Sequence, residues 1–495
     1  MAKFRVVFQV VFALALALGS GPGCAAAAGP EKASRNVILT SDFDDAALGA
    51  EAAEGMAARM GIVEVPELQA YIEAIGRRLI PFAPARSFDY TFHIVDQEAP
   101  NAFALPGGYI YLSRGLLTLV NSEDELACVI GHEITHAAER HAASRQQFSL
   151  RLNPLSIGYM RAGTLAAYGR EQEGDADRGG QILAAKAGWD PAAMATFMTD
   201  VEAMDRLTLG WSRLPGFFDS HPASPQRVAA SSNRAQNLRW TRRSPIAPDE
   251  HAFLAKMEGL TLGTDPKQGI FEGSRFLHPD MDFSLNFPDG WELVNQHDVV
   301  GAIEPLGRAS IALKIAGPGD DPKAAAHLFM ESELRESDGH VEGKQAIRVG
   351  SLSAYRIKIA AADVRGFMTF IAYGGFVYRI DSIATKGQIA SFQGRGRAVT
   401  RSFRPLTPKE KALVRVTRLA LVQGRGGESL GALSARTANE LDLATTAVVN
   451  DLFVDERLQD GQWIKIGRAE VYVPEAAEEA SGEVTESELG RPPRP

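Results

Sequence analysis

Between residues 122 and 138, apolar residues recur every three or four positions, which is the spacing of a helix with one buried face. These positions are Leu126, Ala127, Val129, Ile130, Ile134 and Ala137. Ser122 stands just before this run, and Glu125 follows Ser122 by three residues. That spacing is typical of a capping box at a helix start. The pattern therefore predicts a largely buried helix that begins after Ser122.

A second helical pattern runs from Arg170 to near Gly188, where a glycine marks the expected helix end. Glu173 and Asp177 lie four residues apart near its start, so they share one face. An acidic first turn is ordinary for a helix because it complements the helix dipole. Taken alone, this segment does not indicate a metal site.

Two strand patterns precede these helices. Residues 88–95 alternate between apolar and polar side chains, which is the period of a strand. A second run, 101–105, leads through Pro-Gly-Gly into 109–112, and this predicts a hairpin. A sheet edge of this kind can hold an extended peptide as an added strand. A hairpin that only packs on the helix is the alternative.

The strongest chemical signal lies in the first helix, where residues 132 to 136 read His-Glu-Ile-Thr-His. His132 and His136 project from one helix face and can share a metal ion, and Glu133 lies where it can act on a metal-bound water. Catalytic zinc takes three protein ligands and one open position, so Glu173 is the candidate third ligand. Asp177 would orient a ligand histidine. We expect one zinc ion per chain; a structural histidine pair is the alternative.

Three other residues with ligand-type side chains are predicted not to bind metal. Cys128 lies in the apolar part of the motif helix and shares its face only with His132. His93 belongs to the strand pattern. His141 falls five residues after His136 and therefore lies on a different helical face.

The remainder of the chain predicts further domains, because 495 residues exceed what one core usually organises. Residues 241–248 have the composition of a linker. An α+β domain is expected at 275–406, without a cluster of ligand-type residues. Its strand patterns lie at 283–287, 311–315, 355–359, 367–373 and 376–383, and its helical patterns lie at 322–335 and 390–402.

The two ends of the chain set the expected compartment. Residues 1–28 combine Lys3 and Arg5 with an apolar run and small residues, as in a secretory signal peptide. An exported, periplasmic protein is expected, and an outer-membrane lipoprotein attached at Cys24 is the alternative. No later stretch is apolar enough for a transmembrane helix. An acidic tail at 474–495 is predicted to be disordered.

Charge and cysteine content narrow the choice of partners. The formal net charge is −9, which disfavours nucleic acid and anionic membrane surfaces. The sequence has two cysteines, and one of them lies in the signal segment. An internal disulfide framework is therefore not expected.

Four separated motifs carry a family resemblance. In order they are 101–111, 114–117, 131–136 and 173–177. They resemble the gluzincin metallopeptidases, in particular the family of CAAX prenyl protease I, the bacterial heat-shock membrane protease and the periplasmic β-barrel-assembly-enhancing protease. The resemblance covers about residues 40 to 235. It implies a mainly helical, zincin-type peptidase domain with a small sheet at 35–240, so the whole chain is expected to be a multidomain α+β protein.

The resemblance also implies roles for individual residues. His132, His136 and Glu173 would bind zinc, and Glu133 would accept the proton of the zinc-activated water that attacks a peptide carbonyl. Peptide or protein substrates would then dock on the sheet edge. By resemblance, that edge is formed by Asn101, Ala102 and Phe103.

Residues 220–227 resemble a later His-Pro…Arg segment of the family. This implies that His221 and Arg227 face the metal, as further candidates for catalysis. His221 would either help to bind the transition state or occupy the fourth zinc position as a self-inhibitory plug. Alternatively, His-Pro simply begins a helix.

Residues 412–473 predict a strand, two helices and a strand. This βααβ order resembles LysM, which implies binding to the N-acetylglucosamine polymer of cell walls, that is, to peptidoglycan. Extra residues at 424–427 and a longer connection at 437–446 depart from that pattern. A role in packing alone is the alternative.

Two functions from different classes follow. The first is a zinc endopeptidase of the bacterial cell envelope that degrades misfolded exported or outer-membrane proteins. The second is a wall-associated binding or chaperone protein whose zinc site is structural or latent. The intact Glu133 favours the first, because a structural site needs no base beside the metal.

Overall fold

The computed structural model describes residues 42–141, 169–208, 217, 221, 225–336, 339–361 and 363–474. The predicted signal peptide, Cys24 and the acidic tail from residue 475 lie outside the described residues. The chain divides into two compact units. The first unit contains the described residues up to Gly263 together with Thr417–Ala469, and the second contains Thr264–Val416 together with the residues from Glu470.

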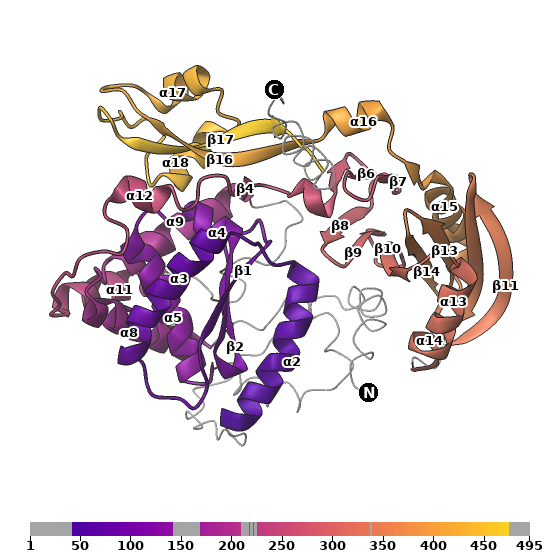
Figure 1. Ribbon diagram of the computed structural model, residues 1–495, viewed down its shortest axis with the longest axis horizontal. Helices are drawn as coiled ribbons and strands as arrows, with labels where there is room; N and C mark the ends of the chain where they lie inside the picture. Colours follow the sequence, from indigo (N-terminus) through magenta and orange to yellow (C-terminus); the bar gives the residue numbers. More distant parts are fainter. Residues whose placement is uncertain are drawn as a thin grey trace, which may run out of the picture. The chain divides into compact units, whose positions relative to one another are not determined.

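The first unit is mainly helical around a small sheet (Figure 1). Its main helices are α2 (Asp42–Met60), α3 (Pro66–Leu79), α4 (Arg114–Leu119), α5 (Glu123–Ala138), α8 (Arg170–Ala187), α9 (Ala193–Thr208), α11 (Pro225–Asn237) and α12 (Glu250–Leu254). The small sheet contains β1 (Thr91–Val95), β2 (Ala102–Leu105) and β3 (Tyr109–Ser113) in the order β1-β3-β2. The predicted helical domain with a small sheet is therefore present.

The sheet is buried on both faces. Phe103 and Tyr111 pack with residues of α2 on one face, while Ala102 and Ile110 join the core of α3 and α5 on the other. β1 is parallel to β3, and β2 is antiparallel to it. The predicted Pro-Gly-Gly turn joins β2 to β3, and the positive φ of Gly107, 80°, explains the glycine there.

Residues 241–248 pack on the first unit and are not a free linker. The backbone N–H groups of Ile246 and Ala247 donate to the Glu123 carboxylate at 2.7 to 3.0 Å, and Ala247 is buried in the core. Their polar and proline-rich composition had suggested a linker, but the tertiary contact with Glu123 orders them.

The C-terminal segment has the predicted βααβ order. Its elements are β16 (Arg415–Gln423), α17 (Leu430–Thr437), α18 (Leu443–Val449) and β17 (Trp463–Val471). β16 pairs with β4 (Thr261–Leu262) of the first unit in the order β17-β16-β4. Val449 belongs to the same apolar core as the motif helix α5. We call residues 417–469 the C-terminal module. Through Val449 it contributes to the same apolar core as the helices of the first unit.

The second unit is α+β, as predicted. Its strands are β5 (Ile270–Glu272), β6 (Arg275–His278), β7 (Phe283–Asn286), β8 (Glu292–Gln296), β9 (Val299–Ile303), β10 (Ala309–Pro318), β11 (His340–Val349), β12 (Leu352–Ala360), β13 (Val364–Tyr373), β14 (Phe376–Thr385) and β15 (Arg404–Pro405). Its helices are α13 (Pro322–Glu331), α14 (Glu333–Glu336), α15 (Ile389–Ser402) and α16 (Pro408–Leu413).

A seven-stranded sheet in the order β11-β12-β13-β14-β10-β9-β8 forms the centre of this unit. The predicted hairpin at Gly374 and Gly375 joins β13 to β14, with both glycines at positive φ. β11 was not predicted, because it is an edge strand whose side chains are mostly exposed and therefore lack the apolar alternation of a half-buried strand.

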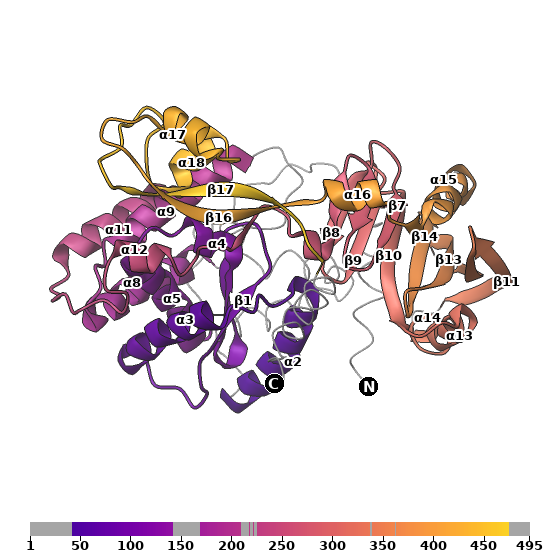
Figure 2. The same cartoon turned by 45° about the horizontal axis from the view of Figure 1, so that its top comes forward.

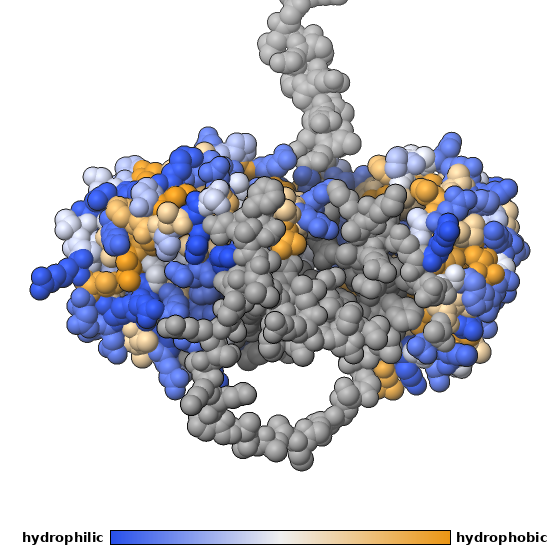
Figure 3. All heavy atoms as spheres, turned by 90° about the horizontal axis from the view of Figure 1, so that it is seen from below, coloured by the Kyte–Doolittle hydropathy of each residue, from blue (hydrophilic) through white to orange (hydrophobic). Residues whose placement is uncertain are grey.

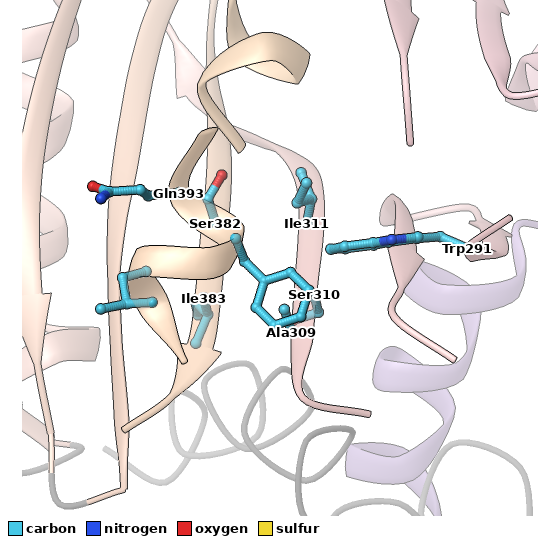
Figure 4. A pocket seen from close by; sticks show the side chains of 9 residues that line it. Trp291, Ala309, Ser310, Ile311, Ser382, Ile383 and Gln393 are labelled. Carbon is cyan, nitrogen blue, oxygen red and sulfur yellow. The ribbon is translucent and has the colours of Figure 1, made fainter. Parts of the chain in front are cut away.

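One small pocket of the second unit lies between α15 and the strands β10 and β14 (Figure 4). Trp291 and Phe392 line it together with Ser310 and Ser382. It contains no group of potential metal ligands. We assign it no chemistry.

The surface gives little further indication of a partner. On the face shown in Figure 3, hydrophilic and hydrophobic side chains of the described residues are intermixed. Among the described residues, no helix combines the length and apolarity needed to span a bilayer.

Candidate metal centre

The motif helix α5 is fixed at its start by side-chain contacts. Ser122 caps it by accepting from the backbone N–H of Glu125 at 3.2 Å. The Glu125 carboxylate accepts from the N–H of Asn121 at 2.7 Å, so the reciprocal bond of the predicted capping box is shifted by one residue. In the first turn, Glu123 accepts from Tyr71 Oη and Trp189 Nε1 at 2.6 and 2.7 Å. These bonds hold the start of the helix to Ser122, to Tyr71 of α3 and to Trp189.

Glycines let α8 approach α5 closely. A Cβ on Gly180 would lie 2.7 Å from the backbone nitrogen of His132, and a Cβ on Gly131 would lie 3.0 Å from the carbonyl oxygen of Gly180. Both separations are too short for a side chain. This close contact brings Glu173, one turn into α8, to the face of α5 that carries the two histidines.

Four side chains converge at this crossing. Potential ligand atoms of His132, His136, Glu173 and His221 all lie within 4.8 Å of one another. All four residues are buried, with exposures of 0 to 1%. His132 Nε2 lies 2.9 Å from His136 Nε2 and 3.2 Å from His221 Nδ1. The structure thus brings the three expected ligands together and adds a fourth.

The donor set fits a zinc ion. A tetrahedron with zinc bonds of about 2.0 to 2.1 Å has edges of about 3.3 Å between ligand atoms. The Glu173 oxygens lie 3.1 Å from His221 Nδ1, 3.6 Å from His136 Nε2 and 3.7 Å from His132 Nε2. Imidazole and carboxylate are also the ligand types that zinc accepts. The spacing and the chemistry of the set therefore match one tetrahedral zinc.

Each motif histidine has a partner on its other ring nitrogen. His132 Nδ1 lies 3.1 Å from the Asp177 carboxylate, and His136 Nδ1 lies 2.9 Å from Nδ1 of His141. Such contacts fix the tautomer and orientation of a metal-binding imidazole. His141 is outside the convergent set, in line with its prediction as a non-ligand. Its contact with His136 was not foreseen, because the helical spacing ends before residue 141.

Arg227 lies behind the ligands. Its guanidinium donates to both oxygens of Asp177 at 2.7 and 2.9 Å and lies 2.9 Å from Glu173. Another of its nitrogens donates to the His221 carbonyl at 3.1 Å. Arg227 therefore holds two carboxylates and the backbone of a third site residue, whereas the resemblance had implied that it faces the metal as a candidate for catalysis.

Glu133 is buried beside the convergent ligands. It is 0% exposed, and neither carboxylate oxygen has a hydrogen-bond partner among the described residues. The nearest ion-pair contact is His221 Nε2, 3.6 Å from Oε1. Burying a carboxylate without a hydrogen-bond donor costs free energy. The position of Glu133 therefore indicates that a bound ligand donates a hydrogen bond to it.

The electrostatics of the site reflect this crowding. Burial raises the pKa of Glu133, against the attraction of His221. Burial also lowers the pKa of His136 well below its usual value, and the neighbouring histidine His132 adds to this. For Asp177 burial would raise the pKa, but hydrogen bonds from Arg227 and His132 lower it to about 2. Asp177 is therefore an anion that can accept from His132.

His221 also touches the sheet edge. Its Nε2 lies 3.2 Å from the carbonyl oxygen of Ala102 on β2. The N–H of Phe217 donates to the Pro100 carbonyl at 2.8 Å, and the N–H of His221 donates to the Phe217 carbonyl at 2.7 Å. β2 is the edge strand of its sheet. His221 thus contacts the strand that was expected to bind substrate, and Phe217 bonds to Pro100, two residues before that strand.

The three predicted substrate-binding residues take different positions. Ala102 presents its carbonyl to the site. The Phe103 side chain packs toward α2, and the Asn101 amide donates to Gln97 at 3.1 Å. Cys128 and His93 lie outside the convergent set, as expected, and the Cys128 thiol is free and buried.

The part of the chain that carries this site is similar to known metallopeptidases. Residues 66–235 match peptidase family M48. The β-barrel assembly-enhancing protease of Escherichia coli is 29% identical over 225 residues, which cover 41% of this chain and 45% of that protein. The mitochondrial metalloendopeptidase OMA1 of Schizosaccharomyces pombe is 30% identical over 172 residues, which cover 32% of this chain and 50% of that protein. This chain thus spans about half the length of the curated relatives it matches.

Among solved structures, the cyanobacterial PsbP of Synechocystis aligns with 29% of this chain and 99% of that chain at 14% identity, with a TM-score of 0.24. A likeness of this size indicates neither a shared fold nor a shared role.

Proposed function

We propose that this protein is a zinc-dependent endopeptidase, since residues 66–235 match the model of peptidase family M48. His132, His136 and Glu173 would hold the zinc, which supplies a water of lowered pKa and polarises the substrate carbonyl. Glu133 would accept the proton of that water and pass it to the leaving amine. The observation that carries the proposal is the buried Glu133 carboxylate, whose oxygens have no hydrogen-bond donor among the described residues.

The surrounding residues would hold this arrangement in place. Asp177 and His141 would fix the ring orientations of His132 and His136 through the nitrogens that face away from the centre. Arg227 would act as a positioning residue, since its guanidinium is bonded to Asp177 and Glu173.

We further propose that His221 keeps the site latent. A catalytic zinc keeps one position open, whereas His221 Nδ1 lies among the other three ligands. The contact of His221 with Ala102 uses the edge of β2 that an extended substrate would need, and Phe217 bonds to Pro100 just before that strand. Withdrawal of His221 would therefore free a coordination position and the sheet edge together.

The proposed substrates are peptide bonds in misfolded exported or outer-membrane proteins of the cell envelope. Support comes from the relative named as a β-barrel assembly-enhancing protease and from the signal-peptide pattern of residues 1–28. Binding to peptidoglycan through the C-terminal module stays a prediction.

One observation favours a different function. Four protein ligands without an open position are typical of structural zinc, so a binding or chaperone protein with a structural site is the second candidate. The two candidates differ in what they require of Glu133. A structural zinc site would still hold its zinc after Glu133 is replaced. In an endopeptidase the same replacement would stop peptide hydrolysis.

The test uses the full chain, zinc analysis and cleavage of an unfolded protein. Wild type, Glu133→Gln and His221→Ala are compared. We expect Glu133→Gln to retain zinc and lose cleavage, and His221→Ala to raise cleavage. Retained zinc with unchanged cleavage in Glu133→Gln would reject the mechanism. A plain loss of activity in His221→Ala would reject latency and favour a transition-state role for His221.

A further inference from the structure

A buried lysine of the C-terminal module reaches the turn before the motif helix. Lys465, on β17, is 1% exposed. Its Nζ donates to the carbonyl oxygens of Thr118, Leu119 and Val120 at 2.9, 3.0 and 3.0 Å. Carbonyl groups at the end of a helix have no partner within the helix. Lys465 therefore caps α4 from a distant part of the sequence.

The capped turn leads directly into α5. Asn121 donates through Nδ2 to the Leu119 carbonyl at 3.0 Å and through its N–H to Glu125 at 2.7 Å. Glu125 also accepts from Thr196 at 3.0 Å. Through α4 the same turn is joined to β3, which pairs with the edge strand β2. This turn thus connects the helix that carries two metal ligands to the sheet that contacts His221.

The lysine is held in place from its own side. Asn450 donates through Nδ2 to the Lys465 carbonyl at 2.9 Å and accepts from the Lys465 N–H at 2.7 Å. Trp463, two residues earlier, stacks on His251 with ring centroids 4.1 Å apart. The module therefore presents the amine from a fixed strand.

Burial of the Lys465 amine costs free energy, because the charged group loses its contact with water. Desolvation lowers the pKa of Lys465 to about 7, against the attraction of Glu125, Asp200 and Asp451. An apolar residue at this position would avoid the desolvation penalty but would remove one donor from each of three carbonyl groups, of which the Leu119 carbonyl still accepts from Asn121.

We propose that Lys465 is a positioning residue for the metal centre. Through this residue the C-terminal module supports the geometry of the centre. The amine fixes the α4–α5 turn, and through it the start of the helix that carries His132 and His136. This proposal depends on one part of the proposed function, namely that the metal centre binds zinc.

The test is Lys465→Met, which keeps an apolar stem of similar length and removes the amine. We expect faster backbone hydrogen exchange at residues 119–126 and a zinc Kd weakened about tenfold, the low end for loss of an outer contact. The matched control is Lys314→Met, which removes the other buried lysine, 8% exposed, from the second unit. That variant should leave both measurements unchanged.

Unchanged exchange and zinc Kd in Lys465→Met, or an equal change in both variants, would overturn the proposal. If Lys465→Met does not fold, Asn450→Ala releases the lysine backbone while keeping the amine, and the same local change is expected. If the chain hydrolysed no protein, the proposed function would fail, whereas exchange and zinc affinity would still decide the role of Lys465.

Discussion

The two units each bury a cluster of charged side chains, but the clusters are built in opposite ways. In the second unit, Arg379 donates to Glu333 at 3.0 Å and lies 3.0 Å from Asp381, so the anions have a cation beside them, although Asp381 Oδ1 has no hydrogen-bond partner among the described residues. In the first unit, ring nitrogens and the Glu173 carboxylate converge, and within the part of the chain that the structure describes the Glu133 oxygens have no hydrogen-bond donor.

The contrast teaches how to tell a site from a structural ion pair. Buried charge alone indicates neither, because buried ion pairs occur in stable cores without any chemistry. Acceptors that converge without a donor are different, since their mutual repulsion is relieved only by a cation or a proton. Among the described residues, the Glu133 oxygens of the first unit have no hydrogen-bond donor, whereas the carboxylates of the second unit's cluster lie beside the Arg379 guanidinium.

The sharpest test of the contrast is Glu133→Gln. The substitution keeps size and removes the base, and a general base typically contributes about 10²- to 10⁴-fold to rate. We expect kcat to fall by about a thousandfold while zinc content and Tm stay near wild type. The measurement is initial-rate proteolysis of an unfolded protein together with metal analysis.

Arg379→Met probes the other cluster. Removing the cation leaves the buried Asp381 and the half-buried Glu333 without their main partner, and loss of one partner of a buried ion pair typically costs about 3 kcal/mol or more. Urea unfolding should show this loss, while zinc affinity stays unchanged. If the variant lost zinc affinity while its unfolding free energy stayed unchanged, the charged cluster of the second unit would not be independent of the metal centre.

His141→Ala tests the outer contact of the metal centre. Loss of such a contact typically weakens metal binding by about 10- to 100-fold, because His136 then lacks its partner at Nδ1. We expect this range in a chelator competition assay. His141→Gln, which can still offer an acceptor, should recover part of the affinity, and equal loss in both variants would argue against an orienting role.

The smallest expected effect is a pH dependence in the second unit. Burial lowers the pKa of His278 to about 4, against the attraction of Asp280. Between pH 4 and 6.5 the unfolded state therefore binds more protons, so stability falls as the pH falls through this range. At pH 5 the expected loss relative to neutral pH is about 2 kcal/mol.

The measurement is the difference in unfolding free energy between wild type and His278→Asn at several pH values, which cancels contributions from the metal centre. We expect the variant to lose this part of the slope between pH 6.5 and 5. An identical slope in the two proteins would show that His278 is not buried as a neutral ring.

Local sequence signals predicted the elements that carry the site. Ser122 and the apolar spacing place α5, and Gly188 places the end of α8 with φ 94°. The Pro-Gly-Gly and Gly-Gly turns place two hairpins. Short or exposed strands such as β8 and β11 were missed, because solvent contact removes the alternation that marks a half-buried strand.

The sequence by itself determined the two helices, the spacing of His132 and His136 on one face, and the presence of Glu133 beside them, because these depend on residues a few positions apart. For His221, the family resemblance had implied a place at the metal, and the tertiary structure gave its distances to the other ligand atoms. The tertiary structure alone decided that His141 supports His136, and that Lys465 of the C-terminal module caps the turn before the motif helix. Those contacts join segments whose relative position depends on how the helices and strands pack, and no local periodicity records that.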